Sequence, residues 1–331
     1  TVPMIQEKSM NGTRLKMGVV GAGYFGTRHA RVYAGMKSVD LVGIADTDAA
    51  AARKLAAQTG AKAWQRPDAL VGLVDAVSIT TPSRSHAEVT LPYIRAGLPV
   101  LIEKPIALDL GDATRIIRAA GKSGAPVLIG HVERFNPAVE ALLESVDSPV
   151  FVESARLGRF SGRARDTDVV CDLLIHDLDL LLAIFAEQPR AVTAIGAPVF
   201  SDKVDMVSAR FTYEDGGAAS ITASRVALKD KRNMHVFCER QGYFRLDFQA
   251  QALQRVPPPD PAVEPRAFVA QTMERPDAPP PLEAELAHFV EVAAARARPR
   301  VTAEDGRNIL KLALRVLRSI ETTRRVRARR D

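Results

Sequence analysis

A lysine, an aspartate and a histidine stand at positions from which they could together oxidise an alcohol. Lys104 lies in the tripeptide Glu103-Lys104-Pro105, directly after the apolar run VLIE. Asp172 and His176 are four residues apart in a segment with helical spacing, so the carboxylate can orient the imidazole on a shared face. Histidine is well suited to remove a hydroxyl proton near neutral pH. A lysine ammonium can stabilise the oxyanion that develops while hydride leaves the same carbon.

Each of these residues also has a plainer interpretation. A lone lysine at the end of a strand is usually solvated. The pair Asp172 and His176, taken alone, fits equally well a helix N-terminal aspartate and a buried histidine whose nitrogens are hydrogen-bonded. The catalytic interpretation requires that other elements of the fold bring the three side chains together, whereas the plainer interpretation does not.

A glycine-rich loop forms the candidate cofactor site. Gly21-Ala22-Gly23-Tyr24-Phe25-Gly26 follows an apolar run and opens a helical pattern. Gly21 permits a tight turn, Gly23 lets the backbone approach a pyrophosphate, and Gly26 allows close packing of helix and strand. Asp46 ends the next apolar run, where a carboxylate accepts hydrogen bonds from ribose hydroxyls and repels the extra phosphate of NADP. We therefore expect NAD as the cofactor; an ordinary glycine turn is the alternative.

The pattern of apolar residues predicts the fold that positions these groups. In residues 14–135, continuous apolar runs alternate with helical patterns, which indicates a doubly wound parallel Rossmann sheet that binds NAD. Residues 136–302 contain one helical pattern followed by strand-like runs, which indicates an open, mostly antiparallel α+β domain for substrate binding and oligomerisation. Within it, the proline-rich stretch 257–281 predicts an extended loop. Residues 303–323 predict a helix that packs back on a domain, and residues 324–331 a basic tail.

Composition excludes several classes of protein. The chain has 331 residues, 47% hydrophobic and 25% charged, which is typical of a globular protein with two domains. Its net charge is +6, but the last eight residues contribute +4, and only 5% of residues are aromatic, so we expect no nucleic-acid partner. Cys171 and Cys238 show no zinc or disulfide spacing. We expect no metal, no signal peptide and no membrane span, and a cytoplasmic protein.

Several motifs together resemble the Gfo/Idh/MocA oxidoreductase family. They are the fingerprint at Gly21, the strand end TTPSRSHAEV, Glu103-Lys104-Pro105, and the pair Asp172 and His176. The resemblance implies a Rossmann domain followed by an open-sheet substrate domain. It implies that Lys104, Asp172 and His176 are the catalytic residues. The cofactor contacts expected on this basis are Gly21, Gly23, Tyr24, Phe25, Gly26, Asp46, Thr81, Pro82, His86, Glu103 and Lys104, with packing as the alternative role of Tyr24 and Phe25.

Two further stretches bear on the substrate. GHVERFNPAV and RLGRFSGRARDTDVVCDLLIHDLDLLL resemble the branch of UDP-N-acetylglucosamine 3-dehydrogenases. Many polyol-oxidising members carry a glycine run before the aspartate, and Asp168-Val169-Val170-Cys171 replaces it here. Arginines crowd the same region, and guanidinium groups bind phosphates in forked pairs; a solvated strand end is the alternative. The expected substrate contacts are His131, Arg134, Asn136, Arg156, Arg163 and His176.

These observations predict an NAD-dependent oxidation of the C3 hydroxyl of a UDP-N-acetylhexosamine, foremost UDP-N-acetylglucosamine. The resemblance further implies that an aminotransferase uses the 3-keto product, toward an amino-sugar lipid A. A dehydrogenase of a free polyol, of inositol or of another sugar is the nearest alternative. An NAD-sensing regulator with the same fold is an alternative that lacks the reaction, and the presence of Lys104, Asp172 and His176 argues against it. An open sheet with one free face favours a homodimer or homotetramer.

Overall fold

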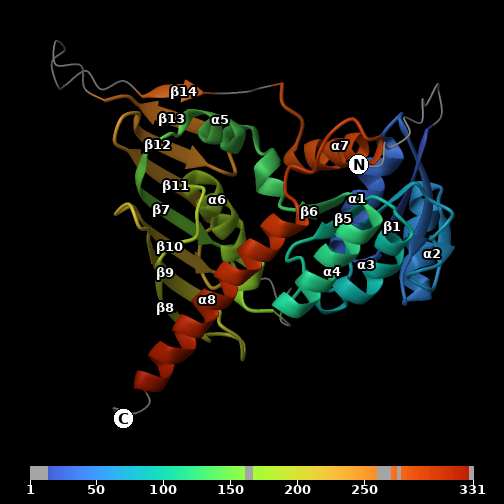
Figure 1. Ribbon diagram of the computed structural model, residues 1–331, viewed down its shortest axis with the longest axis horizontal. Helices are drawn as coiled ribbons and strands as arrows, with labels where there is room; N and C mark the ends of the chain where they lie inside the picture. Colours follow the sequence, from blue (N-terminus) through green and yellow to red (C-terminus); the bar gives the residue numbers. More distant parts are fainter. Residues whose placement is uncertain (1–13, 161–166, 259–269, 274–276, 328–331) are drawn as a thin grey trace. The chain divides into compact units, whose positions relative to one another are not determined.

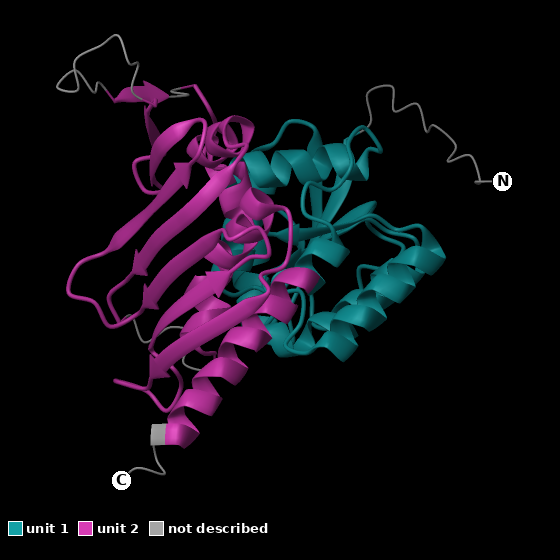
Figure 2. Ribbon diagram, turned by 60° about the vertical axis from the view of Figure 1, so that its left-hand side comes forward, with its two compact units in different colours: residues 1–130, 282–307 teal, residues 131–281, 308–331 magenta. Residues whose placement is uncertain are grey.

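The computed structural model describes residues 14–160, 167–258, 270–273 and 277–327 (Figure 1). The chain divides into two compact units, coloured separately in Figure 2. Unit 1 comprises residues 1–130 and 282–307, and unit 2 comprises residues 131–281 and 308–331. The first boundary lies close to the predicted one at 135, but residues 282–302, predicted in the second domain, return to unit 1. They do so because they pair and pack there: the Ile129 N–H donates to the Val301 carbonyl, and Phe289 is fully buried.

Unit 1 contains the predicted parallel sheet. Its six strands follow the order β3-β2-β1-β4-β5-β6, and all neighbours are parallel. Every residue of β4, β5 and β6 is buried, which explains their continuous apolar sequences. The short edge strand β3 was not predicted. The strands are β1 (Leu15–Val20), β2 (Val39–Ala45), β3 (Lys62–Trp64), β4 (Ala76–Ile79), β5 (Val100–Glu103) and β6 (Val127–Gly130).

Crossover helices connect these strands. Helix α1 packs against α2, and α3 packs against α4. Right-handed crossovers require this pairing, because the chain first adds β2 and β3 on one side of β1 and then adds β4, β5 and β6 on the other side. The strand order therefore reverses between β1 and β4, and in such sheets ligands bind at the carboxyl ends of the strands at this point. The helices are α1 (Tyr24–Gly35), α2 (Ala49–Thr59), the 3₁₀ turn η1 (Ser83–Ser85), α3 (His86–Arg95), α4 (Leu110–Ser123) and α7 (Pro281–Ala293).

Unit 2 is built on an eight-stranded sheet of order β14-β13-β12-β11-β7-β10-β9-β8. Among the described strand pairs of this sheet, only β7 and β10 run parallel, so the prediction of a mostly antiparallel sheet is confirmed. Strand β14 lies within the stretch predicted as a loop, as a three-residue edge strand paired with β13. The strands are β7 (Pro149–Leu157), β8 (Ala191–Ala197), β9 (Met206–Thr212), β10 (Ala218–Ser224), β11 (Lys231–Cys238), β12 (Gly242–Asp247), β13 (Ala252–Val256) and β14 (Gln271–Met273).

Buried and accessible residues alternate along β7, β9 and β10, so these strands bury one face and leave the other more accessible. Helix α6 packs against β7, and α5 packs against β12 and β13. The last helix buries apolar residues at helical spacing, among them Ile309, Leu312, Val316 and Ile320, and its Ser319 Oγ accepts the N–H of Ala194 in β8 at 2.8 Å. The helical elements are η2 (Val132–Phe135), α5 (Pro137–Ser145), the π-helical turn η3 (Val170–Leu174), α6 (Ile175–Phe185) and α8 (Ala303–Arg327).

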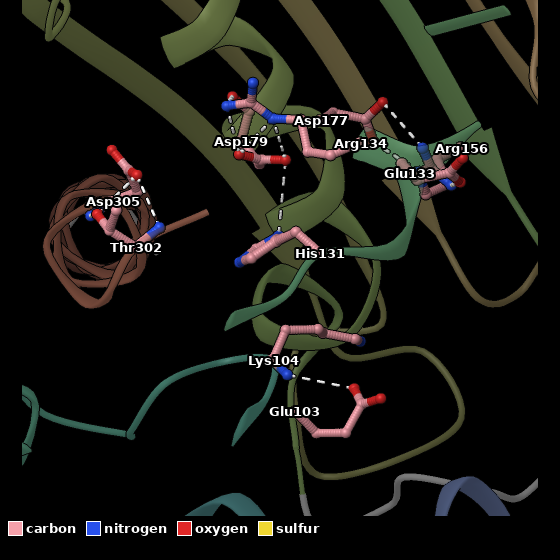
Figure 3. Close-up of polar contacts among 10 residues, drawn as sticks. All are labelled: Glu103, Lys104, His131, Glu133, Arg134, Arg156, Asp177, Asp179, Thr302 and Asp305. Carbon is pink, nitrogen blue, oxygen red and sulfur yellow. Dashed lines mark hydrogen bonds and ion pairs between the residues drawn. The ribbon is translucent and has the colours of Figure 1, made fainter. Parts of the chain in front are cut away.

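Local sequence signals set several helix starts. Asp48 and Asp109 accept first-turn N–H groups at the starts of α2 and α4. At the start of α8, Asp305 Oδ2 accepts the N–H of Thr302 at 2.8 Å, and Thr302 Oγ1 accepts the N–H of Asp305 at 3.2 Å (Figure 3). This is a capping box, in which two otherwise unpaired donors are satisfied reciprocally. In the described part of the chain, no helix combines the length and apolarity that crossing a bilayer requires.

Candidate active site

The glycine loop between β1 and α1 fits a dinucleotide pyrophosphate. Gly21 has a φ of +104°, which side-chain-bearing residues rarely adopt, and a Cβ at Gly26 would lie 1.7 Å from the Gly21 carbonyl oxygen. A Cβ at Gly23 would meet nothing within 4 Å. Helix α1 has no side-chain cap and no acidic residue in its first turn, so its N–H groups and positive dipole end are available to an anion.

Asp46 follows β2 and faces this loop. Its Oδ2 accepts the Ala22 N–H at 2.6 Å, and its Oδ1 accepts the Asp48 N–H at 2.8 Å. Each carboxylate oxygen has a second acceptor position, so the half-buried side chain can still accept hydrogen bonds from ribose hydroxyls. The N–H groups of the glycine loop therefore fit the pyrophosphate of NAD, and the Asp46 carboxylate after β2 fits its ribose.

The segment after β4 lies against the glycine loop. Thr80 Oγ1 donates to the Val20 or Gly21 carbonyl, at 3.0 and 2.9 Å. Thr81 is half-buried and Pro82 is exposed, so both remain candidates for cofactor contact. Tyr24 and Phe25 are 54% and 42% exposed, which argues against the alternative that they only pack under the loop.

His86 connects the loops that follow β4 and β5. Its Nδ1 lies 2.9 Å from the Pro105 carbonyl oxygen and its Nε2 2.9 Å from that of Thr81. Burial lowers the pKa of His86, although its bonds to the two carbonyls act in the opposite direction. The ring is 1% exposed, so the structure supports a role in holding these loops together rather than direct contact with a cofactor.

Lys104 begins the loop after β5 and is half-buried. Glu103, the last residue of β5, is 7% exposed and accepts the Lys104 backbone N–H at 3.2 Å (Figure 3). Its other carboxylate oxygen lies 3.0 Å from His29 Nε2. Both carboxylate oxygens of Glu103 are thus engaged by protein groups. The sequence predicted that Glu103 contacts the cofactor; we propose instead that it supports Lys104.

The second group of candidate catalytic residues stands at an irregular helix start in unit 2. Asp172 lies in the π-helical turn η3, and His176 lies in the first turn of α6; both are half-buried. π-helical turns inside helices occur frequently at functional sites. The His176 ring lies edge-on to the ring of His131, with centroids 6.4 Å apart. Unit 2 therefore brings His176 together with His131, which was predicted as a substrate contact.

A buried carboxylate anchors this group. Asp179 is 1% exposed by its side chain and accepts the Nε and Nη2 groups of Arg134 at 2.9 Å, while His131 Nδ1 lies 3.8 Å from its Oδ2 (Figure 3). Arg134 thus forms a bidentate ion pair within unit 2, and its side chain is 18% exposed. Asp179 therefore has a pairing role within unit 2.

Arg156 and Asn136 have internal partners as well. The Arg156 guanidinium donates to Asp177 at 2.8 Å and to Glu133 at 2.9 Å, with its side chain 3% exposed (Figure 3). Asn136 is the N-cap of α5, because its side chain accepts the Ala138 N–H at 3.1 Å. We therefore leave both out of the proposed substrate site. Arg163 lies outside the described residues.

Arg156→Met provides a direct test of this placement. Breaking a buried pair by removing one partner leaves an uncompensated charge and costs about 3 kcal/mol or more, so we expect the melting temperature to fall by about 6–12 °C. The KM for substrate should stay within about twofold, since phosphate binding is not expected of this side chain. Differential scanning calorimetry and initial rates measure the two quantities. Arg210→Met, at an exposed position of β9, is the control. A raised KM with an unchanged melting temperature would return Arg156 to the substrate site.

Sequence reasoning missed several residues of this region. Asp177 and Glu133 neutralise Arg156, and His29 pairs with Glu103. The Asn-Pro pair at positions 136 and 137 was a readable helix-start signal. No comparable sequence signal identifies the others, because their partners are remote in the chain.

Comparisons with known proteins agree with the fold of the two units. The model of an oxidoreductase family with an NAD-binding Rossmann fold, GFO/IDH/MocA, matches residues 15–131, and the model of the GFO/IDH/MocA C-terminal domain matches residues 146–244. A UDP-N-acetylglucosamine 3-dehydrogenase of Acidithiobacillus ferrooxidans is 35% identical over 311 residues, 93% of this chain and 97% of that protein. The solved structure of that enzyme aligns with a TM-score of 0.85 over 93% of this chain and 98% of its own. An inositol 2-dehydrogenase of Rhizobium meliloti is 29% identical over 230 residues, 64% of this chain and 69% of that protein.

Proposed function

Because the chain belongs to the GFO/IDH/MocA family of NAD-dependent oxidoreductases, we propose that it oxidises the C3 hydroxyl of UDP-N-acetylglucosamine to the 3-keto sugar. The observation that carries this proposal is the similarity to a UDP-N-acetylglucosamine 3-dehydrogenase across 93% of the chain. The similarity to the inositol 2-dehydrogenase covers 64% of the chain at lower identity, and we propose a free polyol as the second candidate.

In the proposed mechanism, bound NAD⁺ supplies the hydride acceptor. The imidazole of His176 removes the proton of the C3 hydroxyl, and Asp172 holds the ring in the orientation that this requires. The Lys104 ammonium stabilises the negative charge that develops on the C3 oxygen. The carbon loses a hydride and the oxygen a proton, so the hydroxyl becomes a carbonyl. The histidine then passes its proton to solvent.

The remaining unit 2 candidates are proposed to bind the sugar and its diphosphate. His131 lies beside His176, and Arg134 is held by Asp179, so these two side chains have defined orientations. Arg159 follows β7 and is exposed, with its Nε donating to the Leu228 carbonyl at 3.1 Å. A guanidinium with donors left over can bind a phosphate in a forked geometry. We propose Arg159 and Arg163 for that role, because Arg156 is neutralised by internal carboxylates.

A substrate panel tests the proposal. Purified protein with NAD and UDP-N-acetylglucosamine should produce reduced nicotinamide, followed by its near-ultraviolet absorbance, with a kcat/KM at least about a hundredfold above that for myo-inositol. UDP-glucose serves as the matched substrate that lacks the N-acetyl group. Turnover of myo-inositol without turnover of either nucleotide sugar would reverse the ranking. Binding of NAD without reduction by any member of the panel would favour a regulator.

A further inference from the structure

Three buried ionisable side chains meet in unit 1, next to the backbone of Lys104. They are His29 on α1, Glu103 at the end of β5 and Glu285 on α7, with exposures of 0%, 7% and 0%. One nitrogen or oxygen atom of each lies within 4.8 Å of one of the others. We refer to these residues as the acid cluster.

Glu103 connects the acid cluster to Lys104. One carboxylate oxygen lies 3.0 Å from His29 Nε2, so that nitrogen carries the hydrogen that it donates. The other oxygen accepts the Lys104 backbone N–H. A Cβ at Gly130 in β6 would lie 3.4 Å from the Glu103 carboxyl group, so a larger residue at this position of the neighbouring strand would crowd the carboxylate. Glu103 thereby holds the point at which Lys104 leaves the strand.

Glu285 differs from Glu103 in its environment. Among the described residues, neither of its carboxyl oxygens has a hydrogen-bond partner, although both are buried. Burial, and then the negative charge of Glu103, raise the pKa of Glu285 well above its usual value. Burial also acts to raise the pKa of Glu103, but the hydrogen bond and charge of His29, with the charge of Lys104, hold it below the usual value. Two carboxyl groups in one buried place are thus driven to opposite states, one protonated and one ionised.

The other titratable groups that face the cluster do not supply a compensating charge for a second carboxylate. Tyr33 on α1 has its pKa raised, mainly by burial, and its hydroxyl lies 2.8 Å from Ser78 Oγ. Burial lowers the pKa of His86, and its two ring nitrogens face the Pro105 and Thr81 carbonyls rather than a carboxylate of the cluster. A bound cation would also compensate both carboxylates, so loss of a bound metal is one outcome of the test below.

We propose that Glu285 is a neutral carboxylic acid in the working enzyme, and that it acts with His29 and Glu103 as a positioning cluster for Lys104. This rests on the proposed role of Lys104. The neutral Glu285 carboxyl group offers both a donor hydroxyl and an acceptor carbonyl inside the cluster, where His29 Nδ1 is a buried atom without a hydrogen-bond partner among the described residues. With Glu285 uncharged, Glu103 remains the carboxylate that faces His29 and Lys104, so both of its hydrogen bonds are kept.

The protonation state is testable without turnover. Infrared difference spectra between wild type and Glu285→Gln, at pH 6 to 8, should contain the C=O band of a protonated carboxylic acid. Glu283→Gln, at an exposed position of the same helix, is the matched control and should remove no such band. Absence of the band from wild type, or a stoichiometric bound metal that is lost with Glu285→Gln, would overturn the proposal.

Thermal stability gives a second test with a defined sign. An acid whose pKa is raised by folding destabilises the fold increasingly as pH rises from its unfolded pKa, about 4.5, toward its folded pKa. Removing the ionisation should therefore raise the melting temperature of Glu285→Gln above wild type by about 3 °C at pH 8 and by less than about 1 °C at pH 5. A lower melting temperature at pH 8 would mean that Glu285 is ionised and compensated.

The positioning role is tested by turnover. Glu285→Leu offers no donor to the cluster and should lower kcat at least about tenfold, and Glu285→Gln should recover most of that loss because it mimics the neutral acid. The KM for NAD should change by less than about twofold in both variants, and kcat is referred to the folded fraction from the thermal melts, because a loss of folded enzyme alone would lower the apparent kcat. If Lys104 itself proves dispensable, its proposed role in the mechanism fails, while the infrared and thermal results still decide the state of Glu285.

Discussion

Lys104→Met is expected to lower kcat by about a thousandfold while the dissociation constant of NAD stays within about threefold. The ammonium is proposed to stabilise charge that develops only as the hydroxyl is oxidised, and removal of one such donor costs about a hundred- to a thousandfold. The pyrophosphate, in contrast, is expected at the glycine loop after β1, which the substitution does not touch. Initial rates of NAD reduction and calorimetric titration with NAD measure the two effects separately.

Lys122→Met is the matched control, because Lys122 is an exposed lysine in the last turn of α4. It should leave both quantities at wild-type values. Turnover of Lys104→Met within a few-fold of wild type would remove this lysine from the mechanism. A parallel loss of NAD affinity would instead indicate that the side chain serves to bind the cofactor.

Asp46→Ala is expected to lower kcat/KM for NAD by about a hundredfold and to reduce the preference for NAD over NADP. A carboxylate that accepts two ribose hydroxyls contributes about 1.5 kcal/mol or more through each charge-assisted hydrogen bond. The negative charge also repels the additional phosphate of NADP, and alanine removes that repulsion. Initial rates over a range of NAD and NADP concentrations give both ratios.

Asp46 also accepts the Ala22 and Asp48 N–H groups, so its truncation affects the loop as well as the cofactor. Asp46→Asn separates the two effects, because it keeps an acceptor oxygen of similar size and loses the charge. Asp40→Ala, at an exposed position of β2, controls for loss of an acidic residue from the same strand. If the ratio of kcat/KM for NADP to kcat/KM for NAD is no higher in Asp46→Asn than in wild type, the charge of Asp46 does not determine the cofactor preference.

Local patterns were sufficient for most of the fold. The continuous apolar runs that became β1, β2, β4, β5 and β6 are buried on both faces, and burial on both faces is what such runs require. The edge strands β3 and β14 escaped prediction, because a three-residue strand with an exposed face has no distinctive pattern. Helix α7 belongs to unit 1, where its Glu285 lies near Glu103 of β5 and His29 of α1, and no local pattern records such contacts.

The sequence by itself determined the glycine loop, Asp46, and the order of motifs that carry Lys104, Asp172 and His176, because the chemistry of these sites depends on residue type and short spacing. The tertiary structure decided which charged side chains remain available for ligands. Arginines crowded in one segment suggested phosphate binding, but Arg156 meets Asp177 and Glu133. It also placed Glu285 beside Glu103, 182 positions earlier in the chain. A charge buried away from water must find a partner or lose its ionisation, and its partner is chosen by folding rather than by sequence distance.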